Sequence, residues 1–243
     1  MNQISPTDTS PQPIKWFKGG MLQQQVEWSK EEIEHLALLA QADLLFLIAQ
    51  MFAPPSAEMR KMLEIEVPDL NKLLHNSGIP ESDNLAETYQ QIRQQAQSLN
   101  LDVWAAEYNR LFESKIACPI NESGFIRRDK GIILAEIAGF YRAFGRNASE
   151  KVDHLTAELE FVAMLLVMLA QAQGVTRTTH DALGSFSFDH LGEWLPTFCE
   201  RLTETSTLPI YQQMAKLLLS AWFGILTLNQ LPMPEAMPYI KTT

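Results

Sequence analysis

The sequence predicts an all-α protein, a single globular bundle of roughly eight to nine helices. Along most of the chain the apolar residues recur at intervals of three and four, the spacing that places them on one face of a helix. Alternation of apolar and polar residues, which is typical of strands, never persists for six residues. Glycines and prolines mark the ends of the periodic segments, and no internal repeat is visible.

The first expected helix starts at Ser29, which can form a capping box with Glu32, and it stops before Pro54. A later helix ends at Gly145, which is a natural C-terminal cap because glycine tolerates a positive φ. The remaining periodic segments predict helices over residues 56–75, 83–98, 103–112, 132–144, 148–173, 188–203 and 208–231. In the fourth helix Trp104, Tyr108 and Phe112 lie at steps of four, and therefore on one face.

Two segments interrupt the helical pattern. Residues 113–129 contain Pro119 and Gly124 and predict an irregular loop, whereas residues 174–187 predict a polar connector. Pro196 should kink or split the helix that follows the connector. Either interruption could mark a boundary, so the pattern alone is compatible with one domain or two. We expect one domain, arranged as a flexible N-terminal tail over 1–20, an all-α domain over 21–231 and an extended C-terminal tail over 232–243.

Composition indicates which kinds of binding partner and which cellular compartment the protein fits. The net charge of -10 argues against a general nucleic-acid binder and is compatible with a positively charged partner. The two cysteines, Cys118 and Cys199, form no CxxC pair and fit ordinary thiols in a reducing compartment. The N-terminus has neither the basic start nor the apolar run of a secretory signal. No apolar run approaches the ~20 residues that a membrane-spanning helix needs, so we expect a cytoplasmic protein without an integral membrane segment.

The most informative stretch is the start of the helix that leads into the apolar run after Phe161. Asp153 is expected in its first turns, where a carboxylate interacts favourably with the helix dipole. His154 and Glu158 are separated by one turn. Because the later half of this helix is apolar nearly all round, its first turns should emerge at a surface and carry Asp153, His154 and Glu158. Such a polar cluster is a candidate binding edge.

Motifs for catalysis and cofactor binding are weak. The chain has no pair of histidines four apart with a glutamate between them, no GxSxG elbow, no P-loop and no GxGxxG. His154 and Glu158 alone favour a surface ion pair over a metal site. We therefore expect no catalytic residues, no metal and no cofactor. Arg127 to Lys130 is the one basic cluster, and it favours a solvated loop that pairs with nearby carboxylates over a site for an acidic partner.

Five motifs in order resemble the TorD/DmsD/NarJ family of molybdoenzyme maturation chaperones. They are Glu107 to Phe112, Cys118 to Ser123, the Phe-Tyr-x-x-Phe-Gly turn within Gly139 to Gly145, the Asp-His motif at Asp153 to Phe161, and Asp189 to Pro196. Ile120-Asn121 and Val162 depart from the pattern, where the family often has a second proline and a methionine. The resemblance implies a TorD-like all-α fold.

The resemblance also implies a peptide-binding groove. Its residues would be Asp153, His154, Glu158, Tyr108, Leu111, Phe112, Pro119, Glu122 and Phe140. A twin-arginine signal peptide offers an arginine pair and then an apolar stretch. Carboxylates of the set could take the arginines, and its aromatic rings could supply an apolar wall.

By this resemblance the protein is a non-enzymatic chaperone that binds the apo catalytic subunit of a molybdopterin oxidoreductase and its N-terminal signal peptide. It would assist cofactor insertion and delay export until the subunit is folded. The resemblance also implies proteins of molybdenum cofactor biosynthesis as further partners, and a monomer or a domain-swapped homodimer as the oligomeric state. Two alternatives stay open: an all-α scaffold without a groove, and a small helical enzyme that uses His154 with Glu158 or Asp153. The client enzyme and any guanine-nucleotide binding are not specified by the sequence.

Overall fold

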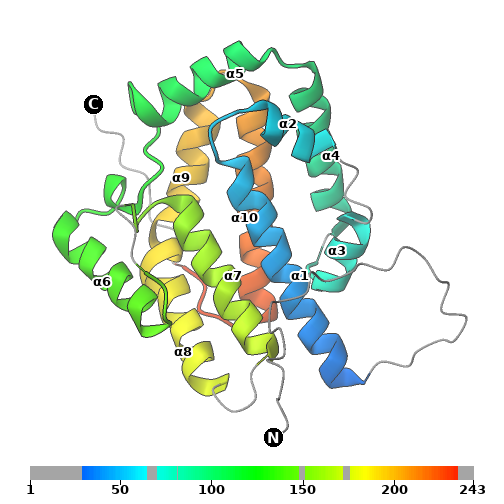
Figure 1. Ribbon diagram of the computed structural model, residues 1–243, viewed down its shortest axis with the longest axis vertical. Helices are drawn as coiled ribbons and strands as arrows, with labels where there is room; N and C mark the ends of the chain where they lie inside the picture. Colours follow the sequence, from blue (N-terminus) through cyan, green and yellow to red (C-terminus); the bar gives the residue numbers. More distant parts are fainter. Residues whose placement is uncertain (1–28, 65–69, 81, 148–150, 172–175, 235–243) are drawn as a thin grey trace, which may run out of the picture.

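The structure is a computed structural model that describes residues 29–64, 70–80, 82–147, 151–171 and 176–234. Over these residues the chain is all-α, as predicted, and Figure 1 shows its arrangement. The helices are α1 (Lys30–Met51), α2 (Ala57–Glu64), α3 (Leu70–Ser77), α4 (Ser82–Ser98), α5 (Leu101–Tyr108), α6 (Lys130–Ala143), α7 (Leu155–Gln171), α8 (Thr176–Phe186), α9 (Gly192–Thr205) and α10 (Pro209–Leu228). The π-helical turn η3 (Ser187–Leu191) joins α8 and α9 into one continuous helix. When α8 and α9 are counted as one, the described residues form nine separate helices.

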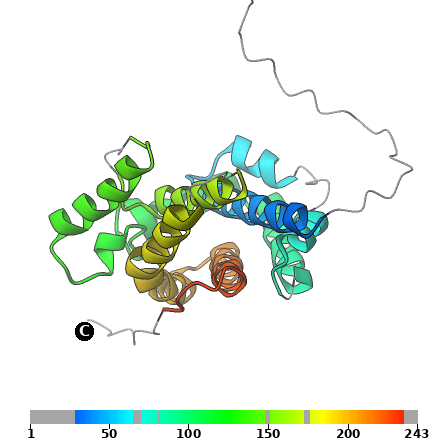
Figure 2. The ribbon, with the colours of Figure 1, turned by 90° about the horizontal axis from the view of Figure 1, so that it is seen from below.

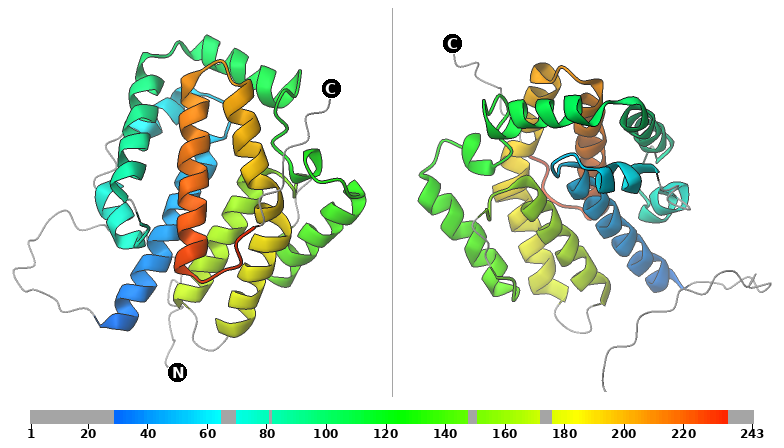
Figure 3. Two further views of the ribbon diagram at one scale, coloured as in Figure 1. Left: turned by 180° about the vertical axis from the view of Figure 1, so that it is seen from behind. Right: turned by 45° about the horizontal axis from the view of Figure 1, so that its top comes forward.

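The long helices form two layers. α1 packs along α7 in one layer, and α9 with α10 forms the layer behind it. Figure 3 shows the second layer from behind, with α4 beside α10 and α5 crossing one end of the bundle. α6 lies outside these layers, on the side away from α4, as Figure 2 shows from below. The space between α6 and the bundle is filled by aromatic side chains, with Phe140 and Tyr141 packed on Phe161 and Phe186.

The core is built around α7 and α10. Ten residues of α7 are buried, which agrees with the apolar character of its sequence on all sides. Trp104, Trp194 and Trp222 are completely buried and come from α5, α9 and α10. Tyr108 and Phe112 stack edge to face, and Phe112 does so again with Tyr211 of α10, as their shared face predicted.

Several helix ends follow their sequence signals. The Ser29–Glu32 capping box is present. Gly145 has a φ of +73° and ends α6 as predicted, because the N–H groups of Gly145 and Arg146 donate to the carbonyls of Arg142 and Tyr141. At the other end of α6, the Asp129 carboxylate accepts hydrogen bonds from the first free N–H groups of the helix.

The structure corrects three predicted boundaries. α7 starts at Leu155, not at Ala148, so Asp153 lies in the turn before the helix. The segment 174–187 was predicted as a connector, yet Thr176–Phe186 is helical because Thr179, Leu183 and Phe186 recur at threes and fours and bury one face. The predicted helix over 56–75 is represented by the separate helices α2 and α3, with residues 65–69 outside the described part.

The helix containing Pro196 is interrupted one turn earlier, at the π-turn Ser187–Leu191. There the N–H of Gly192 donates to the carbonyl of Ser187, five residues back. α9 itself runs unbroken from Gly192 to Thr205 through Pro196, so the prediction that Pro196 splits the helix is wrong. The predicted N-terminal tail, 1–20, lies outside the described residues, as do residues 235–243 of the predicted C-terminal tail, 232–243. Residues 231–234 are described and belong to no helix or strand.

Candidate functional site

The loop of residues 114–129, between η1 and α6, is joined to the start of α7. Here η1 is the π-turn Asn109–Glu113 that continues α5, and the loop contains the 3-10 turn η2 (Glu122–Gly124). Asn121 and His154 form an antiparallel bridge, flanked by hydrogen bonds from Glu122 N to Asp153 O (2.9 Å) and from Leu155 N to Ile120 O (3.0 Å). Two motifs that are far apart in the sequence thus form one unit.

Asp153 holds this loop with its side chain. Its carboxylate accepts hydrogen bonds from the Asn121 amide (3.2 Å) and from the backbone N–H of Ser123 (3.3 Å). Asp153 is only 3% exposed, so the expectation that it lies at a surface in the first turns of its helix is wrong. The loop is also tight at Gly124, where a Cβ atom would collide with Pro119.

His154 acts as a cap on α7. Its Nδ1 accepts a hydrogen bond from the backbone N–H of Thr156 (3.3 Å) and lies 2.8 Å from the Thr156 hydroxyl. The neutral ring therefore carries its proton on Nε2. Burial, with a smaller contribution from Lys151, lowers the pKa of His154 and favours that neutral form. The predicted ion pair of His154 with Glu158 is absent, because each side chain bonds elsewhere.

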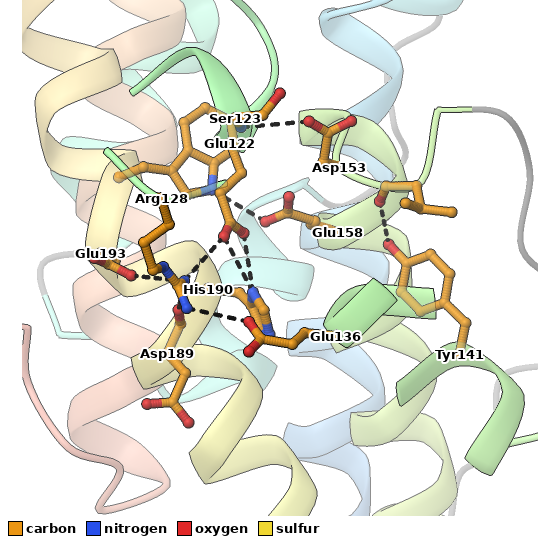
Figure 4. A network of polar contacts seen from close by, with 12 residues as sticks. Glu122, Ser123, Arg128, Glu136, Tyr141, Asp153, Glu158, Asp189, His190 and Glu193 are labelled. Atoms are coloured by element: carbon orange, nitrogen blue, oxygen red, sulfur yellow. Dashed lines mark hydrogen bonds and ion pairs between the residues drawn. The ribbon is translucent and has the colours of Figure 1, made fainter. Parts of the chain in front are cut away.

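Below the loop, two carboxyl groups lie in the interior (Figure 4). Glu158 is completely buried, not surface-exposed as predicted, and its Oε2 accepts a hydrogen bond from the indole N–H of Trp194 (3.1 Å). Glu122 is also completely buried, and its carboxylate oxygens lie 3.1 and 3.2 Å from Nδ1 of His190. Glu122 thus has a buried partner that can neutralise it, whereas the second oxygen of Glu158 has none.

Burial determines the protonation of this pair. It raises the pKa of Glu158 well above its ordinary value, and the nearby charge of Glu122 raises it further. Burial also raises the pKa of Glu122, although the hydrogen bond and the charge of His190 oppose that shift. The arrangement therefore favours a neutral Glu158 close to Glu122, whose carboxyl group contacts His190 and Arg128, and neither carboxyl faces solvent.

Beside this buried pair lies an open groove of about 420 Å³, which we call the α6–α9 groove. It is lined by Arg128, Glu136, Phe140, Asp189, His190 and Glu193. The guanidinium of Arg128 lies 3.1 Å from Glu136, 3.2 Å from Glu193 and 3.6 Å from Glu122 (Figure 4). The expectation that the basic cluster pairs with nearby carboxylates is confirmed for Arg128.

The predicted groove residues do not all meet. Glu122, Asp153, His154 and Glu158 come together around the loop and the start of α7, and Pro119 is in the same loop. Phe140 lies beside them on α6, with its ring packed against His190. The other three are buried in or near η1, at the α5 end of the bundle, packed toward α10: Tyr108, Leu111 and Phe112.

His190 and Trp194 lie within the fifth motif, Asp189 to Pro196, but were not among the predicted site residues. They are four residues apart, across the end of η3 (Ser187–Leu191) and the start of α9, and each binds one of the two buried glutamates. The signal that could have identified them as site residues is this one-turn spacing of two polar aromatic side chains. Arg128 was noted only as part of a charged run.

Two other features, a metal site and a membrane-spanning helix, are absent from the described part of the chain. Within the described ranges no three His, Cys, Asp or Glu side chains gather as a metal ion would need. Among the helices of those same ranges, none combines the length and apolar character required to cross a bilayer.

Comparisons with known proteins agree with the ordered motifs. Residues 80–200, about half of the chain, match the family model of the nitrate reductase delta subunit. The chain belongs to this family, which confirms the predicted membership in the TorD/DmsD/NarJ group.

Two curated relatives carry descriptive names. The chaperone protein TorD of Vibrio cholerae serotype O1 is 32% identical over 77 residues, which cover 31% of this chain and 35% of that protein. The chlorate reductase assembly chaperone protein of Ideonella dechloratans is 36% identical over 90 residues, covering 33% of this chain and 45% of that protein. The chain thus spans less than half the length of the curated relatives that it matches.

One solved structure is also similar. A chain from Archaeoglobus fulgidus, provisionally described as a redox enzyme maturation protein, aligns over 87% of this chain and 98% of its own length. Its sequence identity is 21% and its TM-score 0.44, and at that score the likeness carries no argument here.

Proposed function

We propose that this protein is a maturation chaperone for a molybdopterin oxidoreductase and not an enzyme. The observation that supports the proposal most directly is family membership together with two relatives that are named as chaperones. In this proposal the protein binds the apo catalytic subunit and its N-terminal signal peptide in the cytoplasm. It keeps the subunit available for cofactor insertion and delays its export.

The geometry indicates that the motif residues have different roles. Asp153 and Glu158 are engaged beneath the surface, so we propose that they hold the loop and α9 in position and do not contact the client. His154, Pro119 and Phe140 are partly exposed, so they are the motif residues available for contact. Tyr108, Leu111 and Phe112 would act only through the core on which the loop rests.

The alternative of a helical enzyme that uses His154 is opposed by the same contacts. Nδ1 of His154 accepts from the N–H of Thr156, and the carboxylates of Asp153 and Glu158 bond to other groups. Neither of these two carboxylates is therefore oriented toward the imidazole as the partner of a catalytic histidine. Capture of the client from the native host distinguishes the scaffold alternative from the chaperone.

The decisive experiment is capture of the client from the native host with the tagged full-length chain, followed by mass spectrometry. We expect one molybdopterin enzyme catalytic subunit that retains its N-terminal signal. His154→Ala should reduce its recovery, whereas the exposed control Asp181→Ala should not, because Asp181 lies on α8 with a side chain that is 70% exposed. Recovery of unrelated proteins, or of no oxidoreductase, would exclude the chaperone and favour a scaffold.

A further inference from the structure

The side of α1 that faces solvent is largely apolar. α1 packs against α7, α3 and α10 through its other sides. On the solvent side, Leu36 and Leu39 are exposed, and Phe46 and Leu47 are only half-buried. A helix that is apolar all round is normally buried on every side, so this side of α1 lacks a cover among the described residues.

The first turns of α1 extend this apolar surface. In Figures 1 and 3 they reach beyond the end of α3. Ile33 is 55% exposed there, and Ile33, Leu36 and Leu39 follow one another at steps of three, which forms a ridge along the helix. Single exposed apolar residues need no explanation, but a continuous apolar surface usually binds another segment or protein.

A carboxylate without a cation lies within this surface. Asp43 is exposed, one turn after Leu39 and one turn before Leu47, and it forms no ion pair within the described residues. Partial burial raises the pKa of Asp43, and no neighbouring cation opposes that shift. α1 carries one lysine, Lys30, and four carboxylates, which are Glu31, Glu32, Glu34 and Asp43. The surface therefore fits an occupant that is both apolar and positively charged.

The segment that precedes α1 in the sequence has this composition. Residues 14–28 lie outside the described part of the chain. Their apolar residues are Ile14, Trp16, Phe17, Met21, Leu22, Val26 and Trp28. Lys15 and Lys18 outnumber the one carboxylate, Glu27. The charge of this segment complements that of α1, whereas a second copy of α1 would bring like charges together.

The reach of the segment matches the length of the surface. Along the helix, Asp43 lies roughly 21 Å from Ser29. The residues from Lys18 to Ser29 span about 16 Å at a helical rise and about 36 Å when extended, so Lys18 can lie beside Asp43. Because the segment is joined to α1, its effective concentration at this surface is on the order of millimolar, which favours it over a separate partner.

We propose that residues 14–28 lie along the solvent side of α1 and cover it. Met21 and Leu22 pack on the ridge of Leu36 and Leu39, and Lys15 or Lys18 pairs with Asp43. Trp16 and Phe17 then cover Phe46 and Leu47, further along the helix. The chain thereby shields an apolar surface that would otherwise be open to self-association. This inference is independent of the proposed function.

The test measures how fast an introduced thiol on α1 reacts with a soluble disulfide reagent in the full-length chain. Leu39→Cys places the thiol on the ridge, whereas Cys118 and Cys199 are buried with raised pKa values and react slowly. A second background adds four changes to the segment: Trp16→Ser, Phe17→Ser, Met21→Ser and Leu22→Ser. We expect the introduced thiol to react about fivefold faster in this background, because the cover is lost.

Two controls separate uncovering from a general effect. Gln23→Ser with Gln24→Ser changes polar residues of the same segment and should leave the rate of the Leu39→Cys thiol unchanged. Ile132→Cys places a thiol on α6, where the native side chain is 54% exposed, and it should react equally fast with and without the four serine changes.

The charges provide a second arm, which decides alone if the serine variant does not fold. Lys15→Glu with Lys18→Glu should speed the reaction of the Leu39→Cys thiol, and Asp43→Lys in that background should slow it again.

Equal rates with and without the four serine changes would overturn the inference, as would equal acceleration of the α6 thiol, which would indicate unfolding. A rate that falls as the protein concentration rises would also overturn it, because a second copy would then be the cover. If Leu39→Cys does not fold, Leu36→Cys on the same ridge replaces it, since Leu36 is equally exposed.

Discussion

Glu158 is a buried carboxyl group with one hydrogen bond, from the indole of Trp194, and its raised pKa keeps it neutral. In Glu158→Gln the side-chain oxygen of glutamine can accept the same hydrogen bond from the Trp194 indole. We therefore expect Glu158→Gln to change the free energy of unfolding at pH 5 by less than about 1 kcal/mol, because the hydrogen bond to Trp194 is retained. Glu158→Ala should cost about 2–4 kcal/mol, because it leaves a cavity and an unpaired indole N–H. Urea denaturation measures both.

The pH dependence gives a second readout for the same residue. Because the folded state raises the pKa of Glu158 above 4.5, its stabilising contribution is complete below that pH and is lost as pH rises toward the folded pKa. The stability of wild type relative to Glu158→Gln should therefore fall between pH 5 and pH 8. A difference that stays constant over this interval would mean that Glu158 is ionised in the folded protein.

Sequence motifs identified Asp153, His154 and Glu158 as important but misjudged the exposure of Asp153 and Glu158. Helical spacing shows which residues share a face, yet it does not show which other element covers that face. The loop around Glu122 covers Asp153, and α9 covers Glu158 through Trp194. Arg128 was hard to predict for the same reason, because its partners Glu136 and Glu193 come from two elements that the sequence cannot place side by side.

At the scale of the element, the junction of η3 and α9 depends on Gly192. A Cβ atom on this residue would overlap the backbone carbonyl of Ser187, which cannot move aside as a side chain would. Gly192→Ala should therefore destabilise the protein by about 1–3 kcal/mol. Gly139→Ala in α6 is the matched control, since its Cβ would meet nothing within 4 Å. It should stabilise the protein by about 0.5–1 kcal/mol through helix propensity. Thermal and urea unfolding compare the two, and equal effects would contradict this account.

The link between η1 and the turn after α9 depends on Glu107. Its carboxylate forms two hydrogen bonds with Arg110, at 2.7 and 2.8 Å, and accepts another from the backbone N–H of Thr207 at 2.7 Å. Although burial raises the pKa, these bonds outweigh it and lower the pKa of Glu107 from 4.5 to about 2. The contribution of Glu107 is therefore complete above pH 4.5 and is lost as pH falls toward 2, an effect of about 3 kcal/mol.

The measurement that tests this contribution is the free energy of unfolding of wild type and Glu107→Gln between pH 5 and pH 2. Wild type should lose more stability than the variant over this interval, because glutamine does not titrate. Parallel curves would show that the ion pair with Arg110 contributes nothing that depends on protonation.

At the scale of the whole molecule, the sequence predicted the fold class and most of the helices, because those depend on local spacing. Its errors fell where tertiary contacts override local preference. The threonine-rich segment 176–186 has poor helix propensity, yet burial of Leu183 and Phe186 makes it a helix. Conversely, the helical spacing of the sequence extends before Leu155, but the pairing of Asn121 with His154 prevents α7 from starting earlier.

The arrangement of α1, α4, α7 and α10 supports the expectation of one domain over residues 21–231. α1 packs along α7 and α4 along α10, so each long helix of the first half has its main contacts in the second half. Neither half has a core of its own, and α8 is continuous with α9 through η3, which argues against a boundary at 174–187. Unfolding should therefore be a single cooperative transition, coincident when followed by tryptophan fluorescence and by far-UV circular dichroism.

Cleavage of the chain gives a sharper version of this prediction. If the chain is divided within the exposed residues 113–116, each fragment should be largely unfolded alone, and the two should regain helicity when mixed, because the contacts between α1 and α7 form only across the cut. Circular dichroism of the separate and mixed fragments makes the measurement. Native-like helicity and a cooperative melt in either fragment alone would instead show two domains, with the loop 113–129 as their linker.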